Sequence, residues 1–597
     1  MNAIESTAEL SRPAALALRR AAGVSSPAAA HRTAAAHRET KSSVPAKLRL
    51  AAALVLLLSS AATGLRAAEA PFDDALKTHL ETLTNDKLPG LAVLVAREGK
   101  IVFQSGFGFA DLEKKTPVTP ETKFRIGSVT KQFTAVAILR LAEDGKLALT
   151  DKLEKFFPGF PRGGEITLHQ LLTHTSGLHS YTGKPEFLAR VSRPIAPAEL
   201  IAWFRDDPPD FAPGAGFLYN NSAYFLAGEI VAQVAGKSFA AFLHDTFFAP
   251  LGMRDTGILV NAAPPPGLAR GYSVTDGKAA PALDWDMSWA GGAGALYSTV
   301  GDLHRWNEAL FGGKILKAES FKLMTTAVKL PPGVDGMNYG YGLLISPASR
   351  LPAFGHGGGL HGWSSDLLRL PGQHCTLVTL ANALPPVAGY DPAGITRTIA
   401  RKFLAAEIAK LPPLKTDPQV DRKTFADFAG RYDYQNGVMT VTVADGRLHA
   451  QVTGQPKAEI FPSAPDEFFW KVTDAQVVFL RDEKHQVIAA RHTQGGVTFK
   501  APRLIAAEVK LTAAELDAIL GQYQYGPGAV LTVTRDGDSV FAQLTGQPKF
   551  PIFAKSATEF EWRVVPATVK FSQDKAGKVT TAVHTQAGAT FDAPKLK

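Results

Sequence analysis

An internal repeat in the last third of the chain most constrains the fold. The pentapeptide Thr453–Lys457 recurs as Thr545–Lys549, 92 positions later. The other recurring residues are Trp470 with Trp562, His492 with His584, and the Gly-x-Tyr-x-Tyr segments at 430–434 and 521–525. Each copy alternates apolar and polar residues around Asp-Gly turns, and this period of two predicts antiparallel strands. The period is too long and the copies too few for a solenoid or a propeller. The repeat therefore predicts two small all-β modules, at 421–505 and 511–597.

The region ahead of the repeat mixes helical and strand patterns. Two apolar runs around Glu98-Gly99, within Gly90–Ala110, predict a β-hairpin. Lys131–Leu149 has the length and apolar character of a buried helix that ends near Gly145. This mixture predicts an α/β (α+β) domain at 71–409. The proline-rich segment 410–420 (KLPPLKTDPQV) is typical of a linker.

The first 70 residues are predicted to be a leader that carries a signal peptide. Lys47 and Arg49 form a positive flank, Leu50–Leu58 is an unbroken apolar stretch, and small residues follow it. This stretch is shorter than the roughly 20 apolar residues of a transmembrane helix, which favours a cleaved signal over an uncleaved membrane anchor, the alternative. We therefore expect an exported protein, periplasmic or secreted, with cleavage after Ala67 or Ala70.

Charge and cysteine content argue against two classes of function. The formal net charge is +9, but nine Lys/Arg against four acidic residues in positions 1–70 supply +5 of it. No dense basic run follows, so nucleic-acid binding is not expected. The single cysteine, Cys375, lies in an apolar run and is expected to be a buried strand residue, not a nucleophile. The sequence has no clustered Cys, His and Asp ligand set and implies no metal or organic cofactor.

Three short motifs carry the candidate chemistry. Ser128 and Lys131 form a Ser-x-x-Lys motif, and residues three apart share one face of a helix, so the hydroxyl can meet the amine. Tyr219-Asn220-Asn221 follows a Pro-Gly turn. His356-Gly357-Gly358-Gly359 is a glycine-rich stretch where backbone can approach a substrate closely. Each motif alone has little specificity, because Ser-x-x-Lys recurs at 572–575 and Tyr-x-Asn at 434–436.

The order of these motifs, together with three further segments, resembles the serine β-lactamase-like family. That family includes class C β-lactamases, penicillin-binding proteins, D,D-peptidases and family VIII carboxylesterases. The further segments are LLTHTSGL from Leu171, PGAGFLYNNSAY from Pro213 and GGAGALYSTVGDL from Gly291. The resemblance covers about Phe72–Ala405 and implies an antiparallel sheet flanked by helices, with a helical insertion that carries Tyr219. The two repeats resemble the lipocalin-like β domains often appended to such hydrolases.

The resemblance also implies a role for each site residue. Ser128 attacks the substrate carbonyl and becomes acylated, and Lys131 accepts or relays its proton. Tyr219 protonates the leaving group, and Asn221 orients the substrate and Lys131. The backbone N–H groups of Ser128 and Gly359 form the oxyanion hole. A serine hydroxyl needs such an adjacent base, and each fixed N–H donor lowers the barrier by about 3 kcal/mol.

The third motif departs from the family pattern. β-Lactamases and D,D-peptidases usually have Lys-Thr-Gly where this chain has His356-Gly357-Gly358. The resemblance assigns His356, Gly358 and Gly359 to the substrate and oxyanion region. Lysine is a permanent cation that binds a substrate carboxylate, whereas histidine is mostly neutral at pH 7. We therefore expect hydrolysis of esters or small amides.

Other functions stay open at this stage. One alternative is a D,D-peptidase, D-aminopeptidase or β-lactamase that acts on cell-wall-type peptides or β-lactams. Another is a non-catalytic acyl-binding sensor or scaffold. The expected partner is a small-molecule or peptide substrate. The β modules are candidates for contact with the cell envelope, and the sequence predicts no oligomeric state.

Several further residues are expected to be structural. His174 in HTSGL is expected to make a loop hydrogen bond, and Asp302 to cap the helix that follows it. The repeated His492 and His584 have no nearby metal-ligand partners and are expected to bond at strand ends. For His356 a non-catalytic, backbone-bonded interpretation is the alternative, while Trp363 either lines the pocket or fills the core.

Overall fold

The computed structural model describes residues 77–78, 80–82 and 87–596, with short gaps. The gaps are 185, 259–263, 276, 332–333, 335, 385–390, 435–436, 454, 474, 495–496, 505–510, 527–528, 545–548, 563–566, 575 and 587–588. The predicted leader with its signal peptide, 1–70, lies outside the described residues, as does most of the second pentapeptide. The chain forms two compact units, one ending at Leu411 and one beginning at Pro412.

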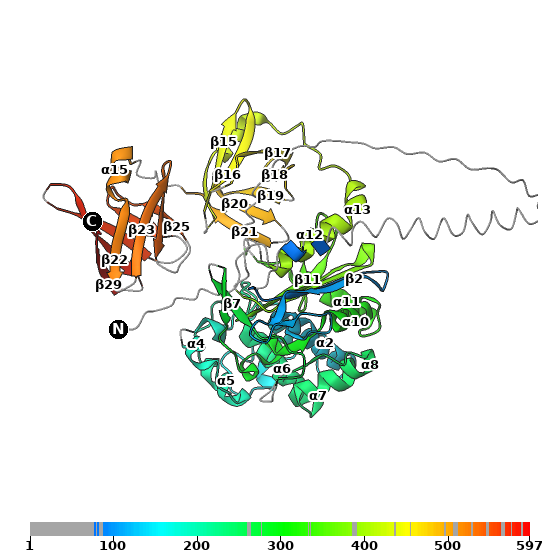
Figure 1. Ribbon diagram of the computed structural model, residues 1–597. Coiled ribbons are helices and arrows are strands. Elements are labelled where there is room, and N and C mark those ends of the chain that lie inside the picture. The colour runs from blue at the N-terminus through cyan, green and yellow to red at the C-terminus, as the bar shows by residue number, and fades with distance from the viewer. Residues whose placement is uncertain are drawn as a thin grey trace, which may run out of the picture. The chain divides into compact units, whose positions relative to one another are not determined.

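A six-stranded antiparallel sheet forms the centre of the first unit, in the order β10-β11-β12-β13-β1-β2 (Figure 1). Alternate side chains of a strand point to opposite faces, and here both faces are buried. Along β1, Ala92 and Leu94 face one core, while Leu91 and Val93 face the other. The predicted hairpin is confirmed, because β1 pairs with β2. The strands are β1 (Leu91–Arg97), β2 (Lys100–Phe107), β10 (Leu344–Ile345), β11 (Phe354–Leu360), β12 (Trp363–Leu370) and β13 (Cys375–Ala381).

Helices cover both faces of this sheet. α2 (Thr130–Glu143) and α10 (Val300–Phe311) contribute to the core on one face, and α12 (Pro392–Phe403) contributes to the core on the other. α2 is buried over most of its length, as the apolar residues spread around it predict. Cys375 is fully buried at the start of β13, as expected.

The segment between β2 and β10 contains the predicted helical insertion, together with short strands. Its other helices are α3 (Leu168–Leu172), α4 (Phe187–Arg190), α5 (Pro197–Phe204), α6 (Asn221–Ala235), α7 (Phe239–Leu243), α8 (Ala249–Leu251), α9 (Gly291–Gly294) and α11 (Ala318–Met324). Its strand groups are β3 (Phe109–Asp111) with β4 (Thr116–Pro117), β5 (Phe124–Arg125) with β9 (Leu296–Ser298) and β6 (Gly257–Ile258), and β7 (Tyr272–Thr275) with β8 (Lys278–Pro281). In the described part of the chain no single helix is long and apolar enough to cross a membrane. Asn221–Ala235 (α6) and Phe239–Leu251 reach that length and composition only together, as a pair bent by 75° at the break between them.

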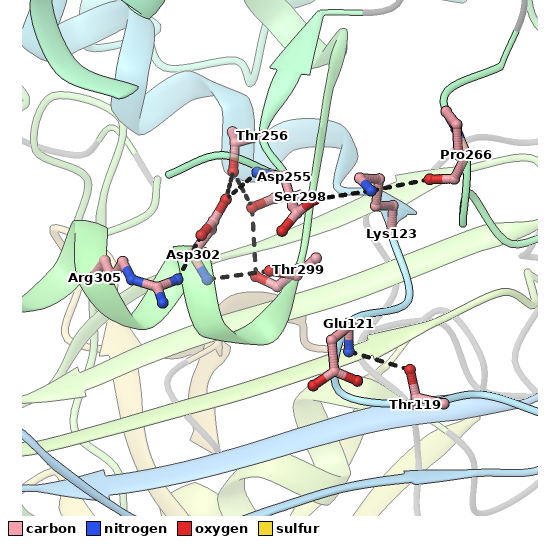
Figure 2. A network of polar contacts seen from close by, with 10 residues as sticks. All are labelled: Thr119, Glu121, Lys123, Asp255, Thr256, Pro266, Ser298, Thr299, Asp302 and Arg305. Carbon is pink, nitrogen blue, oxygen red and sulfur yellow. Dashed lines mark hydrogen bonds and ion pairs between the residues drawn. The ribbon is translucent and has the colours of Figure 1, made fainter. Parts of the chain in front are cut away.

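A polar network beside α10 fixes a strand that supports the site (Figure 2). Thr299 caps α10, since its Oγ1 accepts a hydrogen bond from the backbone N–H of Asp302 at 3.2 Å. The prediction that Asp302 is the cap is therefore wrong: the threonine three residues earlier holds that position. The buried Asp302 carboxylate instead accepts from Thr256 Oγ1 and from the backbone N–H of Asp255, at 2.8 and 2.9 Å. Thr256 also bonds to Ser298 at 2.8 Å, which holds β9 beside β6.

Each copy of the repeat forms an eight-stranded antiparallel meander. In both, a bridge joins the first strand to the end of the last, Tyr432 with Arg503 and Tyr523 with Lys595, so each meander nearly closes into a barrel. The predicted fold class, an α/β domain followed by two lipocalin-like all-β modules, is confirmed.

The remaining strands make up the two copies of the repeat. The strands of the first meander are β14 (Gly430–Asp433), β15 (Val438–Ala444), β16 (Arg447–Val452), β17 (Ala458–Ala464), β18 (Glu467–Trp470), β19 (Ala475–Arg481), β20 (Val487–Gln494) and β21 (Val497–Pro502). Those of the second are β22 (Gly521–Gly526), β23 (Ala529–Asp536), β24 (Ser539–Leu544), β25 (Phe550–Ala554), β26 (Glu559–Trp562), β27 (Ala567–Gln573), β28 (Val579–Gln586) and β29 (Ala589–Pro594). The short helices are α13 (Ala405–Ala409), α14 (Phe425–Phe428) and α15 (Ala513–Ala518).

Candidate active site

Ser128 lies on a 3-10 turn that precedes helix α2, not on the α-helix itself. The turn spans Gly127–Val129, and α2 follows at once. Gly127 has a φ of +50°, which strains any residue with a side chain. A Cβ at Gly127 would also lie 2.8 Å from the backbone nitrogen of Gly359. A glycine is therefore required here, because the backbone just ahead of Ser128 lies directly against strand β11.

Lys131 is fully buried beside Ser128. Its Nζ lies 3.0 Å from Ser128 Oγ, 2.8 Å from Asn221 Oδ1 and 2.9 Å from the carbonyl oxygen of Ala293. Burial lowers the pKa of Lys131 well below 10.5, because the ammonium form loses its hydration. The amide and carbonyl oxygens can only accept, so each of them accepts a hydrogen from Lys131 Nζ. Lys131 Nζ also donates to Ser128 Oγ, and a Lys131 that has lost one proton can accept the proton of the Ser128 hydroxyl in its place.

Tyr219, which is partly buried, completes this group. It precedes α6, whose N-cap is Asn220 and whose first residue, Asn221, bonds to Lys131. Lys131 Nζ lies 4.7 Å from the centre of the Tyr219 ring. Burial raises the pKa of Tyr219, and a hydrogen bond with Ser128 offsets only part of this rise. Tyr219 is therefore a neutral phenol that can donate a proton.

His356 lies on β11 and is held in one neutral form. Its Nδ1 is 2.6 Å from the carbonyl oxygen of Gly357, which can only accept, so Nδ1 carries the hydrogen. Its Nε2, 2.9 Å from the Tyr339 hydroxyl, then accepts from that hydroxyl. Burial, and after it the charge of Lys131, lowers the pKa of His356 to about 3. Both ring nitrogens are thus occupied within the protein.

The glycines after His356 allow β11 to contact the turn that bears the serine. A Cβ on Gly358 would lie 2.0 Å from the carbonyl oxygen of Ile126 and 2.4 Å from Ser365 Oγ. Ser365 Oγ donates to that same carbonyl at 2.8 Å. The contact brings the backbone of Gly359 beside the turn of Ser128, the arrangement that a two-donor oxyanion hole requires.

Neutral and apolar groups surround the site. His174 makes the predicted loop bond: its Nδ1 accepts from the backbone N–H of Asn220 at 3.0 Å. Its ring lies 4.4 Å from that of Tyr219 and 4.5 Å from that of Tyr339, centre to centre. Burial lowers the pKa of His174 well below 6.5, so this ring is uncharged. Trp363 fills the core, since it is 5% exposed and meets the ring of Phe124 edge-on.

Sequence reasoning missed three contributors to the site. They are the Ala293 carbonyl that accepts from Lys131, the Tyr339 hydroxyl that bonds to His356, and Thr182 Oγ1, which accepts from Asn221 Nδ2 at 3.0 Å. A backbone carbonyl and a common hydroxyl leave no motif. For Tyr339 a signal exists: it begins a run in which glycines alternate with tyrosines, NYGYG at 338–342, and such glycines are typical of a close backbone approach.

Metal and thiol chemistry find no support among the described residues. Within them, no group of three or more His, Cys, Asp and Glu side chains is placed to hold a metal ion. Burial raises the pKa of the Cys375 thiol to about 11, which makes it unreactive at neutral pH.

The chain belongs to the beta-lactamase family, whose model matches residues 65–400, more than half of its length. A second family, described as a domain of unknown function (DUF3471), matches residues 414–500 and 506–596, one match for each β module.

The chain is also similar to a curated relative and to two solved structures. Penicillin-binding protein 4* of Bacillus subtilis (strain 168) is 28% identical over 427 residues, which are 68% of this chain and 94% of the relative. The octameric penicillin-binding protein homologue from Pyrococcus abyssi is 24% identical, with a TM-score of 0.49, over 79% of this chain and 97% of that chain. D-amino acid amidase from Ochrobactrum anthropi SV3 with D-phenylalanine is 26% identical, also with a TM-score of 0.49, over 56% of this chain and 100% of that chain. The protein is thus a beta-lactamase-family serine hydrolase related to penicillin-binding proteins.

Proposed function

We propose that this protein is an exported hydrolase that forms an acyl-enzyme at Ser128 and acts on esters or small amides. The observation that carries the proposal is the buried Lys131 amine, whose pKa burial lowers and whose Nζ lies 3.0 Å from the Ser128 hydroxyl. A serine hydroxyl is a poor nucleophile until an adjacent base takes its proton. Export rests on the predicted signal peptide, and removal of residues 1–70 should keep the protein in the cytoplasm in a cell-fractionation experiment.

The proposed reaction begins with proton transfer from Ser128 to Lys131. As the Oγ–carbon bond forms, the carbonyl oxygen becomes an oxyanion, which the backbone N–H groups of Ser128 and Gly359 stabilise. Collapse of this intermediate breaks the bond to the leaving group. The neutral phenol of Tyr219 protonates the leaving group and recovers its proton from Lys131. A water molecule then attacks the acyl carbon along the same path and releases the acid.

The preference for substrates without a carboxylate follows from His356. A β-lactam or a peptidoglycan peptide presents a carboxylate that needs a cation or a hydrogen-bond donor. The Nδ1 hydrogen of His356 is bonded to Gly357, and its Nε2 accepts from Tyr339. Because its pKa is lowered to about 3, His356 stays uncharged at neutral pH. It therefore offers a carboxylate neither a charge nor a donor.

A paired hydrolysis assay tests both parts of the proposal. Residues 71–597 and the variant Ser128→Ala are compared on p-nitrophenyl acetate and on a chromogenic cephalosporin. The chain offers a matched control in Ser572→Ala, the serine of the second Ser-x-x-Lys sequence, on β27. We expect ester turnover that Ser128→Ala abolishes and Ser572→Ala leaves unchanged, with little cephalosporin turnover. Ester turnover that survives in Ser128→Ala would exclude this nucleophile, and rapid cephalosporin turnover would refute the argument from His356.

A second function, slow acylation by penicillins, is favoured by the similarity to penicillin-binding protein 4*, which extends over 94% of that relative. In that case a labelled penicillin should form a long-lived adduct with the wild type and none with Ser128→Ala. Rapid loss of the adduct would instead indicate β-lactamase activity.

A further inference from the structure

The two β modules contain the same cluster of four aromatic side chains. In the first module the cluster consists of Tyr434, Trp470, His492 and Phe499, and in the second of Tyr525, Trp562, His584 and Phe591. The tyrosine, tryptophan and histidine of each cluster belong to the segments that the two copies share in sequence. We call these the module-1 cluster and the module-2 cluster. Because the copies have the same fold, each one is a reference for the other.

The module-1 cluster satisfies its own polar atoms. The Tyr434 hydroxyl lies 2.9 Å from Met439 Sδ and 3.1 Å from His492 Nδ1. His492 Nε2 lies 3.2 Å from Gln494 Oε1, so it donates to that oxygen. Phe499 packs edge-on to the Tyr434 ring at 4.9 Å and belongs to the apolar core of the module. The expectation of a strand-end bond is thus confirmed for His492.

The module-2 cluster has the same side chains without these partners. The Tyr525 hydroxyl and both ring nitrogens of His584 are buried, and none of the three atoms has a hydrogen-bond partner among the described residues. The strand-end bond expected for His584 is therefore not formed. Leu531 occupies the position that Met439 has in the first module. Met439 pairs with Tyr432, and Leu531 pairs with Tyr523, the same tyrosine of the repeat. Buried polar atoms are nearly always hydrogen-bonded in folded proteins, so three together indicate a missing partner.

The rings of the module-2 cluster are also arranged differently. Phe591 is 48% exposed, and its ring centre is 6.4 Å from that of His584. The corresponding distance from Phe499 to His492 is 5.3 Å. Trp562 stacks on His584 at 4.9 Å with an angle of 30° between the planes, whereas Trp470 meets His492 at 72°. In the second module, therefore, an exposed phenyl ring lies beside the three unpaired polar atoms, and Trp562 stacks on His584 from the core.

We propose that the module-2 cluster binds a small neutral ligand in which an amide is attached to a planar ring. A neutral imidazole has one donor and one acceptor, and a phenol adds a second donor. An amide matches this set, since its carbonyl oxygen accepts two hydrogen bonds and its N–H donates one. The planar ring of the ligand packs against the exposed ring of Phe591, as aromatic rings do in ligand sites. Burial lowers the pKa of His584, so the cluster is uncharged and favours an amide over a carboxylate. This binding does not depend on the role of Ser128.

The test is the binding of benzamide to residues 71–597, measured by saturation-transfer NMR. All proteins carry Ser128→Ala, so that the active site consumes no ligand. We expect Tyr525→Phe to weaken the module-2 binding of benzamide about 10-fold, the effect of about one hydrogen bond. Tyr434→Phe is the matched control and should leave the affinity unchanged. Toluene, which has the ring without the amide, should bind all three proteins alike. Equal benzamide affinity in Tyr525→Phe and its parent would overturn the proposal.

Thermal unfolding of the same variants provides an independent readout. Tyr525→Phe removes a hydroxyl that has no partner, so the melting temperature should stay equal or rise. Tyr434→Phe removes a hydroxyl that is bonded to Met439 and His492, so the melting temperature should fall. If Tyr525→Phe lowers the melting temperature as much as Tyr434→Phe, the Tyr525 hydroxyl already has a partner within the folded protein, and the proposed site is refuted.

Discussion

Replacing Asn221 by aspartate should shift the pH dependence of catalysis to higher pH. The change is nearly isosteric and puts a carboxylate where the amide oxygen lies 2.8 Å from Lys131 Nζ. An opposite charge this close favours the ammonium form and raises the pKa of Lys131 by about 1–3 units, against the lowering caused by burial. The reaction needs the neutral amine, so kcat/KM falls about tenfold for each pH unit below that pKa. On the acidic side of the profile the variant should be about 10- to 1000-fold slower.

The assay is the pH profile of kcat/KM for p-nitrophenyl acetate, in the wild type, Asn221→Asp and Asn221→Ala. The alanine variant removes the hydrogen bond without adding a charge, so its rate should fall with no shift of the acidic limb to higher pH. Activity of Asn221→Asp that recovers at high pH supports a neutral Lys131 as the base. An acidic limb that is unmoved in Asn221→Asp, or moved to lower pH, would refute the reasoning.

Two further predictions concern the core around the site. Gly358→Ala should lower the free energy of unfolding by about 1–3 kcal/mol or more and abolish ester turnover, because its Cβ would lie 2.0 Å from the Ile126 carbonyl oxygen. The control is Gly372→Ala, whose Cβ would have no atom within 4 Å and which should change neither quantity. Chemical unfolding and ester hydrolysis measure the two effects. Burial raises the pKa of Asp366 from 3.8 to about 6, so the folded state binds this proton more tightly and stability falls as the pH rises through that window. Asp366→Asn stays neutral and should therefore exceed the wild type by up to about 3 kcal/mol in free energy of unfolding at pH 8, and match it below pH 4; a less stable variant at pH 8 would contradict this account.

The sequence was sufficient where the chemistry depends on residues close together or on a regular pattern. Ser128 and Lys131 are three residues apart, so one turn of chain brings them together whatever surrounds them. The apolar runs of β1 and β2 have a tight turn between them, and the hairpin follows from that local pattern. The repeated β modules were predicted because the same turns and alternation occur twice.

The sequence was insufficient where tertiary contacts determine the chemistry. Nothing in a Ser-x-x-Lys motif indicates that Lys131 is fully buried, yet its burial is what lowers its pKa. The low pKa of His356 depends on its burial, and its Nε2 bonds to Tyr339, which belongs to another segment of the fold. The two modules carry the same histidine, but only the structure separates the bonded His492 from the unpaired His584.

The most direct test of the central claim is mass spectrometry of an acid-quenched reaction with p-nitrophenyl acetate. The account predicts an acetyl group on the peptide that contains Ser128, formed by the wild type and by Ser572→Ala. The adduct should be absent from Ser128→Ala and from Lys131→Met, since the second variant lacks the base. An acetyl group on any other residue, or turnover of the ester with no adduct at Ser128 in the wild type, would contradict the account.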